Sequence, residues 1–294
     1  MIRILTDSAS DILPAEAEQL GVTVIPLNVT LEDSTVLRDG VDMTPTEYYG
    51  ILAGCHKLPT TSQPSPELFE NFFTEAAAAG DEVIGIFLSH ELSGTYQCAK
   101  LAADMVNADN ILFVDSENVC LSEALLVRLA VHLRDSGKSA GQIAAILEHA
   151  KEHLHLVAVI DDLKYLRKGG RLPAAVAVAG GMLGIKPLIT IKEGKVAMAG
   201  KARGLPGAYV ALFKKIRNWA ASIRPLRRWP VTPFPPARWP PSRPTCATTS
   251  SRRTPSCARS AASSAPTPAP APSVSPFLTR TLCWTCDRAF PDAK

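Results

Sequence analysis

The chain has 294 residues, 46% of them hydrophobic, which is enough for one large domain or two smaller ones with a buried core. Its formal net charge of +3 hides a change in composition, because residues 217–294 hold 15 of the 24 prolines, 12 of the 31 Lys and Arg residues and only two acidic residues. Residues 1–216 keep the other 19 basic and 26 acidic residues, a net charge of −7. Because the positive charge is confined to residues 217–294, composition argues against a nucleic-acid partner and an anionic membrane partner.

No apolar run is long enough to cross a bilayer, and the N-terminus, MIRILTDSAS, lacks the features of a secretory signal. We therefore expect no integral membrane segment and a cytoplasmic location. Cys55, Cys98 and Cys120 are scattered through the acidic part of the chain, which favours reduced, packed thiols over disulfides in that compartment.

Strand-like and helix-like segments alternate through residues 1–216, which predicts an α/β fold with a mostly parallel sheet and flanking helices. The expected strands are residues 2–7, 22–31, 82–89, 110–115 and 154–160. The expected helices are residues 14–20, 44–53, 65–80, 93–106, 122–137 and 139–153, with Thr44 as one of the caps.

A second, smaller α/β unit is expected to begin near Asp161, where DDLKYLRKGGRL interrupts this alternation. The following segment, residues 186–200, is predicted to form a hairpin that turns at Glu193 and Gly194. We therefore divide the chain into a first α/β domain at 1–160, the start of a second domain at 161–216 and the anomalous tail at 217–294.

Small hydroxyl residues and a glycine gather where expected strands end or expected helices begin. They are Ser8, Thr61, Ser62, Ser93, Gly94 and Thr95. Each hydroxyl alone is most simply an ordinary helix cap. Ligands of open α/β sheets, however, lie outside the carboxyl ends of the strands, and helix N-termini favour anions. Taken together, these residues predict an anion site.

Four segments, ILTDSASD, TTSQPS, LSHELSGTYQ and DDLKYLRKGGRL, occur in the same order as in the DegV family of bacterial lipid-binding proteins, which residues 1–216 closely resemble. The resemblance implies that two domains enclose one long-chain fatty acid, such as palmitate. The family's carboxylate-binding hydroxyls correspond to Thr61 and Ser93, with Ser62, Gly94 and Thr95 in the same two motifs.

The same resemblance implies a carrier rather than a catalyst. Family members with this role present the acyl chain to a separate ATP-binding subunit of a fatty acid kinase, and an exposed arginine in the RKGGRL loop helps to dock that subunit. Here that arginine corresponds to Arg171 or Arg167, although a solvated turn explains both residues equally well. We expect no cofactor and no metal.

A carrier role agrees with the chemistry of the predicted site. A carboxylate needs hydrogen-bond donors but no acid or base, so hydroxyls and backbone amides suffice. Each buried methylene of the ligand contributes roughly 0.8 kcal/mol, so the acyl chain is expected to supply most of the affinity.

The tail lacks the Gly-Thr-His-Thr-Gly-Pro-Gly-Ala segment that the family has near its C-terminus. The tail contains instead SAPTPAPAPSVSPF, residues 264–277. If the codons for these residues are read one base out of frame, they can encode the missing segment with its residues in the correct order. The same shift of residues 229–234 permits a plausible strand. We therefore interpret residues 217–294 as an out-of-frame, disordered segment that begins near Lys214–Asn218, with a genuine Pro-rich disordered tail as the alternative.

Three other patterns suggest rival functions. Ser93 is a candidate nucleophile of an esterase or acyl hydrolase, but LSGT is not a nucleophile elbow and no histidine is placed beside it in sequence. Cys283 and Cys286 form a lone C-x-x-C pair in the suspect tail, without the second pair of a zinc finger. RKGGRL is glycine-rich but lacks the Lys-Ser/Thr ending of a phosphate loop.

Three histidines near the end of an expected helix form the last rival pattern. His149 and His153 lie one helical turn apart, with His155 close behind. A zinc site needs this spacing and a third ligand, and the glutamate order differs from that of H-E-x-x-H proteases. A solvated helix end is the preferred interpretation.

Overall fold

The computed structural model describes residues 1–161, 163–172, 184–222 and 281–284. By its internal contacts the chain divides into one unit of Met1–Arg224 with Pro272–Lys294 and another of Pro225–Ala271. The second unit lies wholly outside the described residues, so the fold below is that of the first.

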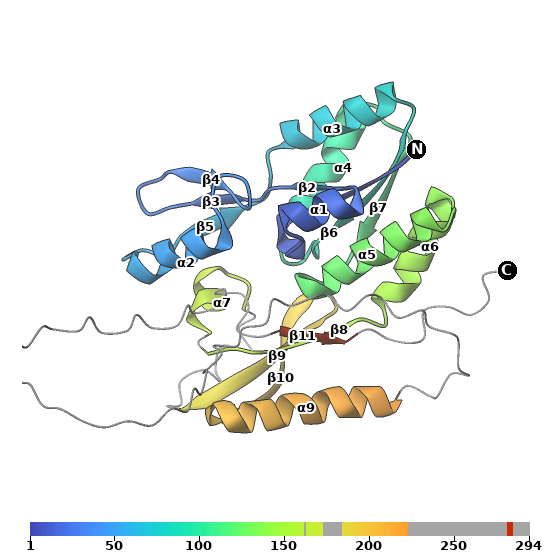
Figure 1. Cartoon of the computed structure of the whole chain (residues 1–294). Helices are drawn as coiled ribbons and strands as arrows, with labels where there is room; N and C mark the ends of the chain where they lie inside the picture. Colours follow the sequence, from blue (N-terminus) through green and yellow to red (C-terminus); the bar gives the residue numbers. More distant parts are fainter. Residues whose placement is uncertain (162, 173–183, 223–280, 285–294) are drawn as a thin grey trace, which may run out of the picture. The chain divides into compact units, whose positions relative to one another are not determined.

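A four-stranded parallel sheet forms the centre of the N-terminal half (Figure 1). Its strands are β1 (Ile2–Asp7), β2 (Val22–Ile25), β6 (Glu82–Phe87) and β7 (Ile111–Asp115). Their order is β2-β1-β6-β7, and every neighbouring pair is parallel. The predicted parallel α/β sheet is therefore confirmed.

Helices cover both faces of this sheet (Figure 1). One face packs against α1 (Pro14–Leu20), α5 (Leu121–Asp135) and α6 (Ala140–Lys151), and the other against α3 (Pro66–Ala78) and α4 (Thr95–Met105). In α3 the apolar residues Phe69 and Phe73, one turn apart, are fully buried. Burial on both faces explains why β6 reads as a continuous apolar run.

A small antiparallel sheet of order β4-β3-β5 was not expected from the sequence. It consists of β3 (Asn28–Thr30), β4 (Val36–Arg38) and β5 (Thr60–Ser62), and α2 (Pro45–Gly54) begins after β4 with a capping box at Thr44. The prediction of a single strand over residues 22–31 is wrong, because the chain leaves the parallel sheet at Pro26, which has no amide proton for a strand ladder.

A second four-stranded sheet is antiparallel and has the order β10-β9-β8-β11. Its strands are β8 (His155–Val159), β9 (Ile185–Lys192), β10 (Lys195–Arg203) and β11 (Thr281–Trp284). The predicted hairpin is confirmed, since Glu193 and Gly194 both have positive φ, 50° and 74°, between β9 and β10. The sheet begins with β8, ahead of the expected start of the second unit at residue 161.

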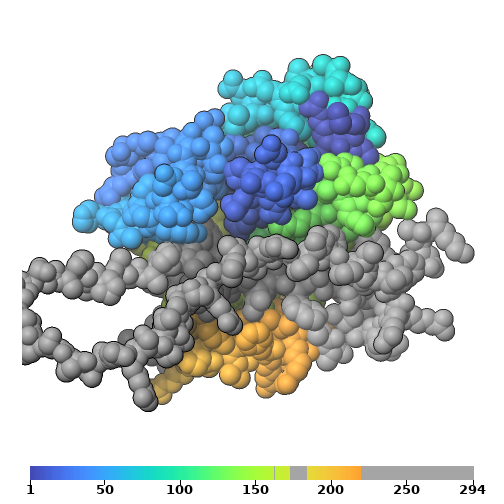
Figure 2. Space-filling model, viewed as in Figure 1, coloured from blue at the N-terminus to red at the C-terminus, as the bar shows by residue number. Residues whose placement is uncertain are grey.

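The long helix α9 (Gly204–Ser222) packs on this second sheet through Ala208, Leu212 and Ile216, which recur at every fourth residue. It continues past residue 216, the predicted end of the second segment, and its orange surface is visible in Figure 2. Apart from the end of α9 and β11, the predicted out-of-frame tail lies outside the described residues.

Two short helices complete the described part. The 3₁₀ turn η1 (Ser8–Ser10) directly follows β1, and α7 (Lys164–Lys168) ends within the RKGGRL segment. Among the described helices, none combines the length and the apolar character needed to cross a membrane.

Candidate functional site

The loop that follows β6 carries the predicted residues Ser93, Gly94 and Thr95; we call residues 88–95 the Ser93 loop. It leaves the carboxyl end of β6, a central strand of the parallel sheet, and leads into α4 at Thr95. This is the edge at which ligands of open parallel sheets bind. The sequence-based placement of the loop at this edge is therefore confirmed.

Ser93 and Thr95 form a linked pair of hydroxyls. Their Oγ atoms lie 2.9 Å apart, and the backbone amide of Thr95 points to the Ser93 hydroxyl at 3.4 Å. Thr95 is fully buried, whereas Ser93 is half-buried. The N-cap residue of α4 is Gly94, which has no side chain to satisfy the amides of the first turn. The turn therefore offers a hydroxyl and amide donors to an anion.

Thr61 and Ser62 lie in β5, the edge strand of the small antiparallel sheet, where Thr61 pairs with Val29 of β3. Thr61 is half-buried and Ser62 is exposed. The prediction that these residues directly precede a helix is correct, but they themselves form a strand.

Gln63 brings the two predicted motifs together. A Cβ atom added to Gly94 would lie only 2.0 Å from Oε1 of Gln63, so the glutamine amide rests directly against this glycine. Gln63 is held from the other side by Asn28, whose Nδ2 donates to the Gln63 carbonyl at 3.2 Å. Gln63 lies within the TTSQPS motif, but we predicted no role for it from the sequence. Its position beside prolines and between hydroxyl residues was the one local indication of a role.

A second polar cluster at the same edge consists of three acids, Asp7, Asp11 and Glu123, which we call the carboxyl cluster. Asp7 and Glu123 are fully buried, whereas Asp11 is exposed. The Asp7 carboxylate accepts hydrogen bonds from the amides of Leu88 and Ala9, at 3.0 and 2.9 Å. Burial nevertheless raises the pKa of Asp7 to about 7. Although Asp11 is exposed, partial desolvation of its carboxyl group raises its pKa to about 6.

Glu123 in α5 is the most strongly affected acid of the carboxyl cluster. Its Oε1 accepts a hydrogen bond from the Thr6 hydroxyl at 3.0 Å, and in the described part of the chain its Oε2 has no partner. Burial first, and then the charge of Asp7, raise the pKa of Glu123 well above its ordinary value. Burial therefore favours the protonated form of Glu123, and no local pattern in the sequence indicated this.

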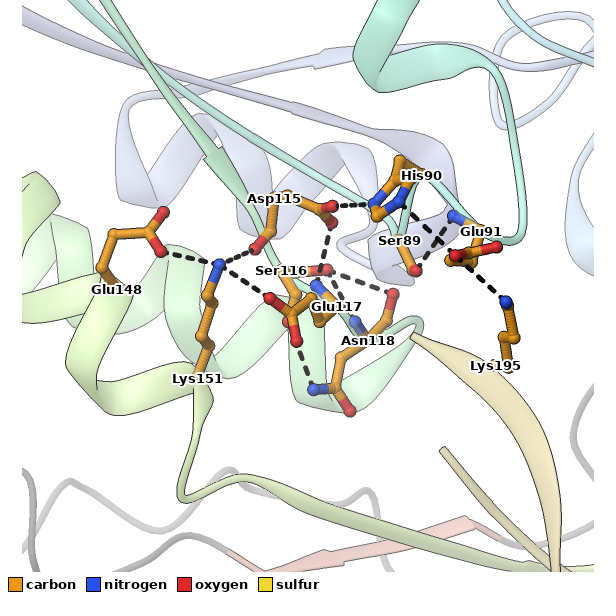
Figure 3. Close-up of polar contacts among 10 residues, drawn as sticks. All are labelled: Ser89, His90, Glu91, Asp115, Ser116, Glu117, Asn118, Glu148, Lys151 and Lys195. Carbon is orange, nitrogen blue, oxygen red and sulfur yellow. Dashed lines mark hydrogen bonds and ion pairs between the residues drawn. The ribbon is translucent and has the colours of Figure 1, made fainter. Parts of the chain in front are cut away.

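The Ser93 loop is also held by the β9–β10 hairpin. Lys195 forms an ion pair with Glu91 at 3.1 Å, which Figure 3 shows beside Ser89. Gly194 approaches so closely that an added Cβ would lie 2.4 Å from the Ser89 hydroxyl. The turn of the hairpin therefore packs against the first residues of the loop.

Arg171, one of the two predicted docking residues, is not free. Its Nε donates to the carbonyl of Leu92 at 2.9 Å, and its guanidinium also donates to the Gly169 carbonyl. Arg171 is half-buried, while Arg167 at the end of α7 is exposed. Of the two arginines, Arg167 is thus the one that presents its side chain to solvent.

His90, three residues before Ser93, hydrogen-bonds through Nδ1 to Asp115 at the end of β7 (Figure 3). The Ser93 hydroxyl is paired with Thr95, and none of its hydrogen bonds within the described residues involves a histidine. The arrangement of a serine nucleophile with its base is therefore not seen at Ser93.

The remaining candidates are distributed as follows. Cys55, Cys98 and Cys120 are free thiols, in agreement with the prediction. Cys283 lies in β11, and Cys286 falls outside the described residues. His155 stacks on Trp219 of α9, and His149 and His153 contact each other through their rings.

Comparison with known proteins identifies the family. The family described as "Uncharacterised protein, DegV family" matches residues 1–227. The chain belongs to the DegV family. A DegV domain-containing protein of Deinococcus radiodurans is 37% identical over 221 residues, which cover 75% of this chain and 78% of the relative.

Solved DegV-family structures share the fold. A fatty-acid-binding DegV protein of Thermus thermophilus has a TM-score of 0.69 at 37% identity, covering 74% of this chain and 78% of its own. A stearic-acid-binding protein of Eubacterium ventriosum has a TM-score of 0.71 at 30% identity, covering 76% and 78%. Both of these neighbours are fatty-acid-binding proteins, and they share the α/β fold of this chain.

Proposed function

We propose that the protein binds a long-chain fatty acid, with the carboxylate at the hydroxyls of Thr61 and Ser93 and the acyl chain buried in the protein. The observation that carries this proposal is the contact of Gln63 with Gly94, which joins the two hydroxyl motifs. Fatty-acid binding by DegV neighbours of the same fold supports it.

The chemistry of the site fits a carboxylate ligand. Ser93, Thr95 and the uncapped first turn of α4 supply donors, and no arginine or lysine is bonded to the Ser93 hydroxyl within the described residues. Hydroxyls and amides stabilise a carboxylate without burying a second charge. The cost of desolvating the head group is then offset by the burial of the acyl chain.

We further propose that the protein acts as a carrier and presents the bound acyl chain to a separate, ATP-binding kinase subunit. The half-buried position of Ser93 supports this role, because a carboxylate bound there is near the surface. The exposed Arg167 is the better candidate for contact with that subunit, since Arg171 is engaged with the Ser93 loop.

Native mass spectrometry of the protein purified from a bacterial host tests the binding proposal. We expect a co-purifying acyl chain, released by organic extraction and regained when oleate or palmitate is added. A chain that carries no lipid and takes up none from vesicles or albumin would contradict it.

The head-group assignment has its own test. Thr61→Ala and Ser93→Ala each remove one hydrogen bond to a charged group, so each is expected to weaken fatty-acid binding by about 1–3 kcal/mol, roughly 5- to 150-fold. For a fatty alcohol of equal chain length, the difference in affinity between the wild type and the variants should be smaller. If both variants bind fatty acid as the wild type does, the carboxylate lies elsewhere.

A further inference from the structure

The end of α6 brings three potential metal ligands together. The helix is assigned as Ala140–Lys151, but Glu152 keeps helical angles, and the amide of His153 still donates to the Ala150 carbonyl at 3.0 Å. His149 and His153 therefore lie on the same side of one continuing turn. Their ring centroids are 4.8 Å apart at an angle of 85°.

Two histidines alone do not make a zinc site, and Glu152 supplies a third potential ligand. Its Oε2 lies 4.0 Å from Nδ1 of His149, and one ligand atom from each of His149, Glu152 and His153 falls within 4.8 Å of the others. His149 and Glu152 are exposed and His153 is half-buried. The cluster is thus accessible to ions in solution.

We propose that these three residues, the α6 histidine cluster, bind a divalent transition-metal ion, with Zn²⁺ as the representative. Two imidazoles and one carboxylate are ligands that Zn²⁺ accepts, at bond lengths of about 2.0–2.2 Å. Tetrahedral coordination requires the ligand atoms to move somewhat closer than they are, to about 3.3–3.5 Å for such bond lengths. Rotation of exposed side chains achieves this without a change in the backbone.

Neighbouring charges do not block the cluster. Lys151, the nearest cation in sequence, is held by Glu148 at 2.7 Å, by Glu117 at 3.1 Å and by the Asp115 carbonyl (Figure 3). Its ammonium group is therefore already paired with two acids.

Binding rather than catalysis is the inference. The order His-x-x-Glu-His also occurs in a class of zinc peptidases. Here, however, the cluster is exposed at a helix end, and the described residues contribute no ligand beyond Glu152. Water is expected to complete the coordination shell.

Isothermal titration calorimetry of the full-length chain with zinc chloride tests this site. The measurements use a Cys283→Ser, Cys286→Ser background, because a C-x-x-C pair can itself bind zinc. We expect His149→Ala and His153→Ala each to weaken Zn²⁺ binding by about 10- to 100-fold or more, since even second-shell changes have effects of this size. Glu152→Gln should weaken it less.

His56→Ala is the matched control, since His56 is exposed and lies outside the cluster. Thermal unfolding in EDTA should be the same for all variants, and added Zn²⁺ should raise the unfolding temperature only when the cluster is intact. Zn²⁺ affinity that is unchanged in both histidine variants, or an absence of binding, would overturn the proposal. Unchanged affinity in Glu152→Gln would contradict the three-ligand set.

Discussion

Two polar clusters lie at the carboxyl edge of the parallel sheet and differ in charge and exposure. In the carboxyl cluster, Asp7 and Glu123 are fully buried and Asp11 is exposed; Asp7 accepts from backbone amides and Glu123 from Thr6. The second, which we call the hydroxyl cluster, is the pair Ser93 and Thr95 together with Thr61, whose segment reaches them through the contact of Gln63 with Gly94. It is neutral, and Ser93 and Thr61 are half-buried. We expect an anion at the second cluster and not at the first, because a carboxylate placed beside Asp7 and Asp11 would meet carboxyl groups that ionise near neutral pH.

The comparison indicates two roles for polar residues at this edge of the sheet. Asp7 ties β1 to the start of the Ser93 loop through the amide of Leu88, so the carboxyl cluster supports the loop. The hydroxyl cluster, next to it, has donors left for a ligand. The predictions below alter one cluster or its supports at a time, beginning with the largest expected effect.

Adding a carboxylate to the hydroxyl cluster should make it resemble the carboxyl cluster. Ser93→Asp is expected to weaken fatty-acid binding by more than about 100-fold, because two carboxylates a few ångströms apart repel each other in a partly desolvated site. A long-chain amine should bind this variant better than the wild type. Fluorescence displacement of a labelled acyl chain measures both ligands.

Thr74→Asp, on the exposed side of α3, adds the same charge away from the loop and serves as the control. It should leave both affinities unchanged. Fatty-acid binding that survives in Ser93→Asp would show that the ligand carboxylate does not lie at the Ser93 loop.

Removing a titratable group from the carboxyl cluster should stabilise the fold. The pKa of Glu123 is raised in the folded state. As the pH rises through about 4.5, the unfolded chain therefore releases the Glu123 proton while the folded chain still binds it. The free energy of unfolding therefore falls as the pH increases toward neutrality. Glu123→Gln, which still accepts from Thr6 through its amide oxygen, should raise the unfolding temperature at pH 7.

The stabilisation by Glu123→Gln should shrink between pH 7 and pH 5, and each kcal/mol gained should raise the unfolding temperature by about 2–4 °C. Differential scanning calorimetry at several pH values gives the slope. Glu16→Gln, which alters a partly exposed acid of α1 paired with Arg128, is the comparison variant. A gain that is equal at both pH values would argue against a retained proton.

The sequence predicted the hydroxyl cluster better than the carboxyl cluster. Ser93 follows an apolar strand and precedes a helix, so periodicity was enough to place it. Thr61 was correctly placed ahead of a helix, but its strand β5 was not predicted. Asp7 and Glu123 are 116 residues apart in the chain, and only the pairing of β1 with α5 makes both of them buried. No local sequence pattern predicts that these two acids are buried together.

The second sheet shows the same limit. The turn at Glu193 and Gly194 was predicted, because a Glu-Gly pair between alternating residues is a local signal. The contact of that turn with Ser89 was not, since it joins segments more than 100 residues apart. The split of residues 22–31 into β2 and β3 has a local signal in Pro26, but the pairing of β3 with β5 has none.

Gly194 is expected to be the most sensitive residue of the hairpin contact. In Gly194→Ala the alanine would have to keep the positive φ of the turn, 74°, which is unfavourable for a residue with a side chain. Its methyl group would also lie 2.4 Å from the Ser89 hydroxyl. We expect a destabilisation of about 1–2 kcal/mol from the backbone alone and weaker fatty-acid binding as the loop shifts. Gly200→Ala in β10, where nothing lies within 4 Å of the added Cβ, is the control and should change neither quantity.

The ion pair of the hairpin should have the smallest effect. Lys195 and Glu91 are 3.1 Å apart, but their side chains are 57% and 34% exposed, so solvent screens the attraction. Lys195→Met is expected to weaken fatty-acid binding by no more than about 1 kcal/mol, roughly fivefold, and the loss should vanish at high salt. Lys192→Met, in the other strand of the hairpin, removes a lysine whose ion pair is with Glu193 rather than with the loop. If Lys195→Met lowers affinity as strongly as Ser93→Ala and does so at all salt concentrations, Lys195 contacts the ligand itself, and the division between ligand-binding hydroxyls and supporting charges must be redrawn.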